Sequence, residues 1–293
     1  MPAGDFSLTQ LNSSIQELWD QKVEEARYAE GVIVNRVSNK SETAKKKGDI
    51  IHVTIDQKYV TVAVGADGVF VPQTYTLVTA DVTLNQWRAV PIQILDQAAS
   101  QSFWTPESTF PTNAGKAFAE RYDADLAGLH GSVAAGNALG STTDPSPFSK
   151  GNAQEALFRL ADTNISLTNL SFILHPVSYF GGLLNEAQLT KANEIGQDKN
   201  VLTTGYQFPL LGVPVFYSTN IVETGSPAVK KNLLVHKSAM AVAWSKNNTT
   251  EKVRATANLT LADLYVMQSV YGFAVVRSDH FVVINTAKLG SFT

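Results

Sequence analysis

The chain has 293 residues, enough for one or two domains that each bury a sizeable core. Its formal net charge of −3 excludes the basic excess of a dedicated nucleic-acid-binding protein, and the absence of cysteine excludes disulfides, thiolate catalysis and cysteine-ligated metals. The first ten residues lack the pattern of a signal peptide, and no apolar stretch reaches the ~18 residues that span a bilayer. The composition therefore predicts a soluble protein, made inside the cell, with no membrane partner.

Residues 1–47 are typical of an N-terminal arm that contains one amphipathic helix. Ser14 and Glu17 form a capping box, and apolar residues follow at helical spacing. Leu18 and Trp19 lie on this apolar stripe. The stripe packs either on its own domain or on a neighbouring subunit, and the sequence favours neither alternative.

Residues 48–86 predict an extended β-hairpin, because apolar and polar residues alternate on both sides of a Gly-Ala-Asp-Gly turn at 65–68. Its outer part, 57–75, has few large apolar residues from which to build a core of its own. An isolated two-stranded hairpin is marginally stable in water, so this one packs on another subunit or on its own sheet. The candidate inter-subunit contacts in the hairpin are Lys58, Tyr59, Phe70 and Tyr75.

A long helix is predicted from Asn113 to Val133 by apolar residues spaced three or four apart. Arg121, Asp123 and Asp125 fall off this stripe, and the two aspartates point to different faces, which argues against a paired carboxylate site.

A linker follows at 140–150, rich in proline and turn formers, where a substitution at the exposed Gly140 is expected to do little. A second amphipathic helix spans 151–163, opened by Asn152. The remaining sheet segments are assigned to a second domain that ends near residue 256.

No catalytic, cofactor-binding or metal-binding residue can be named in this sequence. None of the histidines has a second ligand at metal-binding spacing, and no nucleophile elbow, Walker loop or dinucleotide fingerprint occurs. His175 and His236 each end an apolar run, which favours a capping role over catalysis.

The last hundred or so residues string short apolar segments together in a characteristic order. A strand ends in His175-Pro176 and feeds a helix over 177–184, and a Gly-Val-Pro-Val turn at 212–215 leads to a strand ending in Ser218-Thr219-Asn220. Further pieces are His236, Lys237 and Ala239, then Tyr271, Gly272, Val275 and Arg277, and upstream the strand-like segment 82–102. In this order, the pieces resemble the major capsid protein of tailed double-stranded DNA bacteriophages, whose fold encapsulin shells share.

The resemblance implies an α+β fold, the phage major-capsid fold, in four parts. These are an N-terminal arm (1–47), an extended hairpin loop (48–86), a peripheral domain with a long spine helix (87–145 and 257–293) and an axial domain (146–256). The hairpin would lie across the adjacent subunit. A tight bend or a close approach of the backbone is expected at Gly212.

The function implied is that of a structural protein, not an enzyme, without cofactors. It would self-assemble as pentamers and hexamers into an icosahedral shell around double-stranded DNA, which it would contact non-specifically. Scaffolding, portal and decoration proteins are the expected partners, and the virion capsid, assembled in the host cytoplasm, is the expected location. An encapsulin-like nanocompartment and an α/β enzyme with a distributed site are the alternatives.

Overall fold

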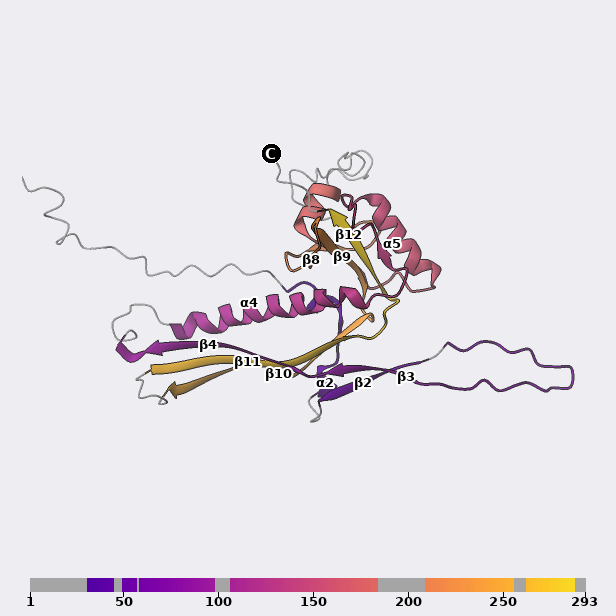
Figure 1. Ribbon diagram of the computed structural model, residues 1–293. Helices are drawn as coiled ribbons and strands as arrows, with labels where there is room; N and C mark the ends of the chain where they lie inside the picture. The colour runs from indigo at the N-terminus through magenta and orange to yellow at the C-terminus, as the bar shows by residue number, and fades with distance from the viewer. Residues whose placement is uncertain are drawn as a thin grey trace, which may run out of the picture.

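The computed structural model of the chain describes these residues: 31–44, 49–56, 58–97, 106–183, 209–255 and 262–287. They form a long sheet with a helix laid along it, a second sheet of shorter strands, and a hairpin that projects from the first sheet (Figure 1). The helix expected around Leu18 and Trp19 lies outside the described residues.

The long sheet has the strand order β1-β10-β11-β4. Its members are β1 (Ser38–Asn39), β4 (Gln86–Leu95), β10 (Met240–Ala255) and β11 (Ala262–Val275). β11 runs antiparallel to both of its long neighbours, β10 and β4. Two short helical turns, η1 (Val34–Arg36) and α2 (Ser41–Ala44), flank β1.

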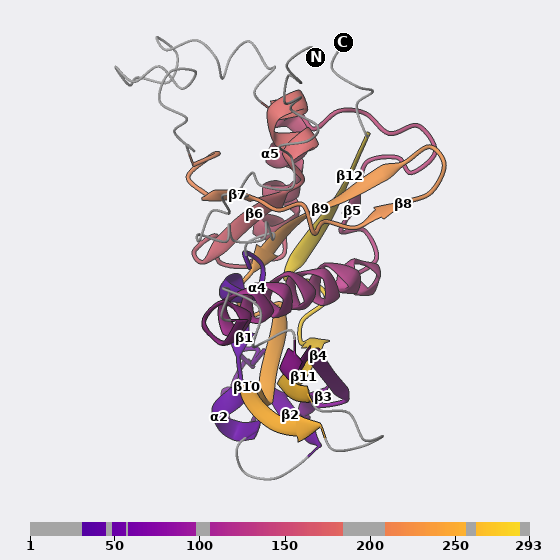
Figure 2. The same ribbon diagram turned by 90° about the vertical axis from the view of Figure 1, so that its left-hand side faces the viewer.

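The predicted long helix is α4 (Pro106–Ala127), which lies along one face of the long sheet (Figures 1 and 2). Part of the predicted stripe is buried, and Phe118 and Tyr122 belong to one core cluster with Tyr265 and Tyr271 of β11. The rings of Tyr122 and Tyr271 meet edge to face with centroids 4.6 Å apart, a favourable aromatic geometry. The helix thus attaches to the sheet mainly through aromatic packing.

The predicted bounds of this helix are wrong at both ends. It begins at Pro106, where a missing N–H is harmless because the first helical turn has no intrahelical acceptor. Pro111, which was expected to precede the helix, lies inside it. After Ala127 the chain tightens into a 3₁₀ turn, η2 (Gly128–Ser132), because glycine is a poor helix former.

The second sheet has the order β5-β12-β9-β6-β7, with β8 paired to β9. Its strands are β5 (Ala138–Leu139), β6 (Leu170–Leu174), β7 (Val215–Tyr217), β8 (Glu223–Thr224), β9 (Val229–His236) and β12 (Phe281–Ala287). Every residue of β6 is buried, as expected for a strand covered on both faces. A π-helical turn, η3 (Val177–Gly182), follows β6, and His175 caps it by accepting the Val177 N–H at Nδ1 (3.1 Å).

Helix α5 (Lys150–Asp162) covers the second sheet with a small apolar face that includes Ala153, Ala156 and Leu160. The predicted cap is wrong by three residues. Ser149 is the N-cap, and its hydroxyl accepts the Asn152 N–H at 3.2 Å. Serine caps well because its short hydroxyl reaches the free N–H groups of the first turn.

Strands that the expected domain boundaries assign to different domains pair within one sheet. The proposed boundary after residue 256 would separate β10 from β11, yet these strands pair along their length. It would also separate β12 from β9, yet these pair from Phe281 opposite Val235 onwards. The chain therefore changes sheet at Ala239 and returns near Arg277. Periodicity cannot detect these crossings, because a strand has the same alternating pattern in either sheet.

Asp123 of α4 was expected on the polar side of the helix, but it is fully buried. Its carboxylate accepts the backbone N–H groups of Val32 (2.5 Å) and Val34 (3.0 Å), which ties the N-terminal segment to α4. Desolvation raises the pKa of Asp123, and these backbone hydrogen bonds oppose the rise. Asp125 accepts the Tyr271 hydroxyl at 2.6 Å instead, so the two aspartates serve separate contacts, as predicted.

Gly140 and Gly212 both have positive φ, +77° and +81°. Around Gly212, among the described residues, a Cβ would meet nothing within 4 Å, so only the backbone conformation requires glycine. At Gly140 a Cβ would lie 2.4 Å from the carbonyl oxygen of Asn285. The expectation that Gly140 tolerates substitution is therefore wrong, since this turn packs directly on β12.

The two glycines predict a ranking of stability losses. Gly212→Ala should lower the free energy of unfolding by about 1 kcal/mol, the strain of a left-handed alanine. Gly140→Ala should lower it by about 3 kcal/mol, because overpacking against the Asn285 carbonyl adds to the strain. Urea-induced unfolding measures both values, and equal losses would show that the 140 turn relaxes away from β12.

Asp123→Ala should lower the free energy of unfolding by roughly 2 kcal/mol or more, because it leaves the Val32 and Val34 N–H groups without their acceptor. Asp162→Ala, at the exposed end of α5, is the matched control and should change stability little. An Asp123 variant as stable as the control would contradict the structural role of this carboxylate.

Candidate interaction surface

The hairpin is anchored at its base by β2 (Ile50–Ile55) and β3 (Val78–Thr83), which pair antiparallel. Ile51 and Val82 point to one face and share a core cluster with alanines of β10. At Gly272 of β11 a Cβ would lie 2.1 Å from the Thr83 carbonyl oxygen, so only glycine allows the strands to approach this closely. The base is therefore fixed firmly to the long sheet.

Beyond the base, the hairpin extends away from the rest of the molecule (Figure 1). At its end the Gly65 N–H donates to the Val69 carbonyl (3.0 Å), and Gly68 turns the chain with a φ of +77°. The predicted turn at 65–68 is confirmed, but regular strand pairing stops at Ile55 and Val78.

The outer hairpin carries apolar side chains that are largely exposed to solvent. Tyr59 is 62% exposed and Val71 is 75% exposed. The exposed apolar side chains of this segment, here called the hairpin tip, are Tyr59, Val60, Val62, Val64, Val69, Phe70, Val71, Tyr75 and Leu77. A contiguous apolar surface of this kind marks a binding surface in a folded protein.

The hairpin tip is nearly free of charge. In residues 58–77, Lys58 and Asp67 are the only side chains of the Lys, Arg, Asp and Glu types. Desolvation, and then the negative charge of Asp56, raise the pKa of Tyr75, so its phenol is neutral. The tip thus presents a neutral apolar surface rather than an electrostatic one.

Of the predicted contact residues, the structure brings two together. Tyr59 and Tyr75 stack across the hairpin with centroids 6.2 Å apart and planes 10° from parallel. Phe70 lies exposed nearer the end of the loop, and Lys58 is exposed at its start. Leu18 and Trp19 lie outside the described residues.

Sequence reasoning missed part of this surface. Val62 and Val71 belong to it, and their regular alternation was read only as a sign of strand. Trp87 of β4, on the edge of the long sheet, is 73% exposed and was also missed. The available signal was that valine alternates with threonine and alanine over 60–64, residues too small to cover the valine side chains.

The described polar groups make several structural contacts. Within the described stretches, no group of three or more histidine, aspartate or glutamate side chains is placed to hold a metal ion. No described helix is both long enough and apolar enough to cross a membrane. His236 accepts the Ser238 N–H at Nδ1 (3.2 Å), the capping role its position predicted.

Comparisons of the sequence find no relatives. No protein-family model matches the chain, and no curated protein matches it.

Comparison of the structure finds many similar folds. A solved structure described as "Mycobacterium phage Che8" superposes with a TM-score of 0.75 at 23% identity and covers 92% of this chain and 96% of its own. The capsid of cyanophage P-SCSP1u gives a TM-score of 0.76 at 12% identity, with 95% of each chain covered. The capsid of Ralstonia phage GP4 gives 0.70 at 11% identity, covering 99% of this chain and 100% of its own. The chain therefore has the fold of bacteriophage capsid proteins, the α+β fold that its sequence resemblance implied.

Proposed function

We propose that the chain is the major capsid protein of a tailed bacteriophage, a structural protein whose copies form an icosahedral shell around double-stranded DNA. The observation that carries the proposal is the hairpin tip, an apolar projection without a core, in a chain that has the capsid fold over its whole length. Such a projection is stable and soluble only when another molecule covers it.

A second copy of the chain is the partner that best fits the tip. The tip has almost no charge, so it needs an apolar partner surface rather than a nucleic acid or an acidic ligand. When each copy extends a hairpin onto its neighbour, every subunit both gives and receives one contact, and such head-to-tail contacts build a ring when the rotation between neighbours closes.

Rings of five and six subunits, joined through many such contacts, would build the shell. Each interface is modest, and the shell is stable because every subunit is held at several places at once. Leu18 and Trp19 of the arm are proposed as additional inter-subunit contacts. Scaffolding and portal proteins, and a decoration protein, are the proposed partners in assembly, and the virion is the proposed location.

Electron microscopy of the purified protein in negative stain tests this function. Closed isometric particles are expected, and a protein that stays monomeric under all assembly conditions would contradict the proposal. Particles from the native source should contain nuclease-protected DNA. Particles that hold a cargo protein and no DNA would indicate a nanocompartment instead.

Deleting residues 58–75 should abolish shell formation without unfolding the subunit. The deletion leaves a four-residue connection between β2 and β3, a length that hairpins commonly use. The core cluster at the hairpin base is untouched, so thermal unfolding of the subunit should stay within a few degrees of the wild type. Normal particles from the deleted chain would refute the role of the tip in assembly.

A further inference from the structure

Two chain connections pass side by side between the two sheets. One joins β9 to β10 and the other joins β11 to β12. The backbones of the two connections are hydrogen-bonded to each other. The Val276 N–H donates to the Ala239 carbonyl (2.8 Å), and the His236 N–H donates to the His280 carbonyl (3.1 Å). Any rotation of one sheet against the other must strain or open this junction.

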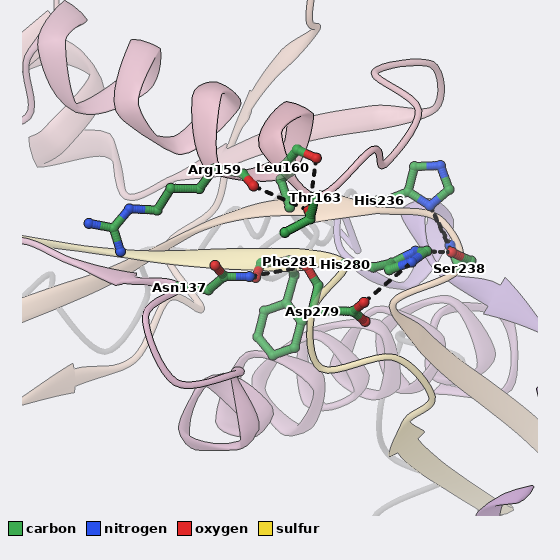
Figure 3. A network of polar contacts seen from close by, with 9 residues as sticks. All are labelled: Asn137, Arg159, Leu160, Thr163, His236, Ser238, Asp279, His280 and Phe281. Carbon is green, nitrogen blue, oxygen red and sulfur yellow. Dashed lines mark hydrogen bonds and ion pairs between the residues drawn. The ribbon is translucent and has the colours of Figure 1, made fainter. Parts of the chain in front are cut away.

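A bridge of three side chains locks the junction (Figure 3). Ser238 Oγ lies 2.8 Å from His236 Nδ1 and 2.8 Å from His280 Nδ1. The two imidazole rings are 5.5 Å apart between centroids and nearly perpendicular. One hydroxyl therefore links a histidine of the first connection to a histidine of the second.

The surrounding groups fix the direction of the hydrogen bonds. The Ser238 backbone N–H donates to His236 Nδ1 (3.2 Å), so this nitrogen carries a lone pair. The proton of His236 is then on Nε2, and a hydrogen bond between the His236 ring and the backbone of Thr168 raises its pKa. Because the hydroxyl has a single proton, the order of donation is His280 Nδ1–H to Ser238 Oγ, and Ser238 O–H to His236 Nδ1.

Protonation of His280 leaves the hydrogen bonds of the bridge in place, whereas protonation of His236 breaks one of them. His280 can take a proton at Nε2, which faces the Asp279 carboxylate at 3.9 Å, and the bridge stays intact. His236 can take one only at Nδ1, where two hydrogens from Ser238 already point. A proton there turns the acceptor into a donor, and the Ser238 N–H loses its partner.

We propose that the His280–Ser238–His236 bridge is a proton-sensitive latch between the two sheets, closed at neutral pH and opened in acid when His236 is protonated at Nδ1. The latch is a property of the single chain, so it does not depend on the proposed capsid function.

Burial holds the pKa of His236 below its ordinary value; the hydrogen bond to Thr168 offsets part of this shift, and the positive charge of Arg277 adds to it. Burial also lowers the pKa of His280, and the negative charge of Asp279 opposes that shift. Lys237, on the same connection as His236, is exposed. From the segment before β5 comes the neutral Asn137, whose amide donates to the Asp279 carbonyl at 3.0 Å.

The sign of the pH effect follows from these shifts. The pKa of His236 is lower in the closed junction than in the open one, so the open form binds more protons as the pH falls. The closed junction is fully stabilised above the ordinary histidine pKa of about 6.5 and loses stability below it. The opening constant rises towards tenfold per pH unit until the lowered pKa is reached.

Hydrogen exchange of the full-length chain, followed by mass spectrometry at pH 7.5 and 5.5, tests the latch. After correction for the chemical exchange rate, opening at 236–240 and 276–281 should rise roughly five- to tenfold in acid. In His236→Asn the amide oxygen replaces Nδ1 as an acceptor that cannot be protonated, so the rise should become clearly smaller and only the share contributed by His280 should remain. His130→Asn, which alters a histidine in η2 away from the bridge, should keep the full rise.

A wild-type junction that opens equally at both pH values, or a His236→Asn junction that responds as strongly as the wild type, would overturn the proposal. If His236→Asn fails to fold, NMR titration of the wild-type imidazoles decides instead. His236 should titrate below the ordinary histidine pKa of about 6.5 and carry its proton on Nε2 when neutral. An ordinary titration, or a neutral form with the proton on Nδ1, would overturn the latch.

Discussion

The rest of this structure depends on one constraint: the hairpin tip cannot bury its apolar side chains within its own chain. A fully buried large apolar side chain is worth about 1.5–3 kcal/mol relative to an exposed one. The tip carries several such side chains, from Tyr59 to Leu77, and all of them are at least half exposed apart from Val62. Part of the gain on docking is lost to ordering the loop, which leaves a contact of moderate strength. Contacts of that strength suit a shell, because a wrongly placed subunit can dissociate before the closed shell holds it at several contacts at once.

The same strand that anchors the hairpin also joins the two sheets. In β10, Ala241 and Ala243 face the hairpin base, while Met240 and Val242 face the core at the junction of the sheets. This division follows from the period of two in a strand, which sends alternate residues to opposite faces. The proposed latch lies where β10 begins. The junction and the base of the hairpin are thus connected by one continuous strand.

Local features of the fold were predictable from the sequence. The hairpin, its turn at 65–68, the long helix and the tight bend at Gly212 each depend on neighbours within a few residues, where spacing and glycine placement carry the signal. The sequence resemblance added the overall architecture, because the order of several weak motifs along the chain is more specific than any one of them.

Features set by distant contacts were not predictable. Gly140 looks like an exposed linker residue until β12 is placed against it, and Asp123 looks like a surface residue until the Val32 and Val34 N–H groups reach it. The exchange of strands between the sheets has the same cause, since pairing partners lie far apart in the sequence. The sequence indicated Tyr59, Phe70 and Tyr75 as candidate contact residues. The valines of the hairpin tip became candidates only from the structure, in which the hairpin projects away from the rest of the molecule.

The central claim is that a neighbouring subunit covers the hairpin tip, and a single thiol measures this directly. Because the chain has no cysteine, Val71→Cys introduces a unique label site at the most exposed apolar position of the tip. The measurement is the rate of maleimide labelling in dissociated subunits and in assembled particles, with denatured particles as the control for full reactivity. The account predicts rapid labelling in subunits and labelling at least about tenfold slower in particles, since burial excludes the reagent. Equal rates in the two states would contradict it.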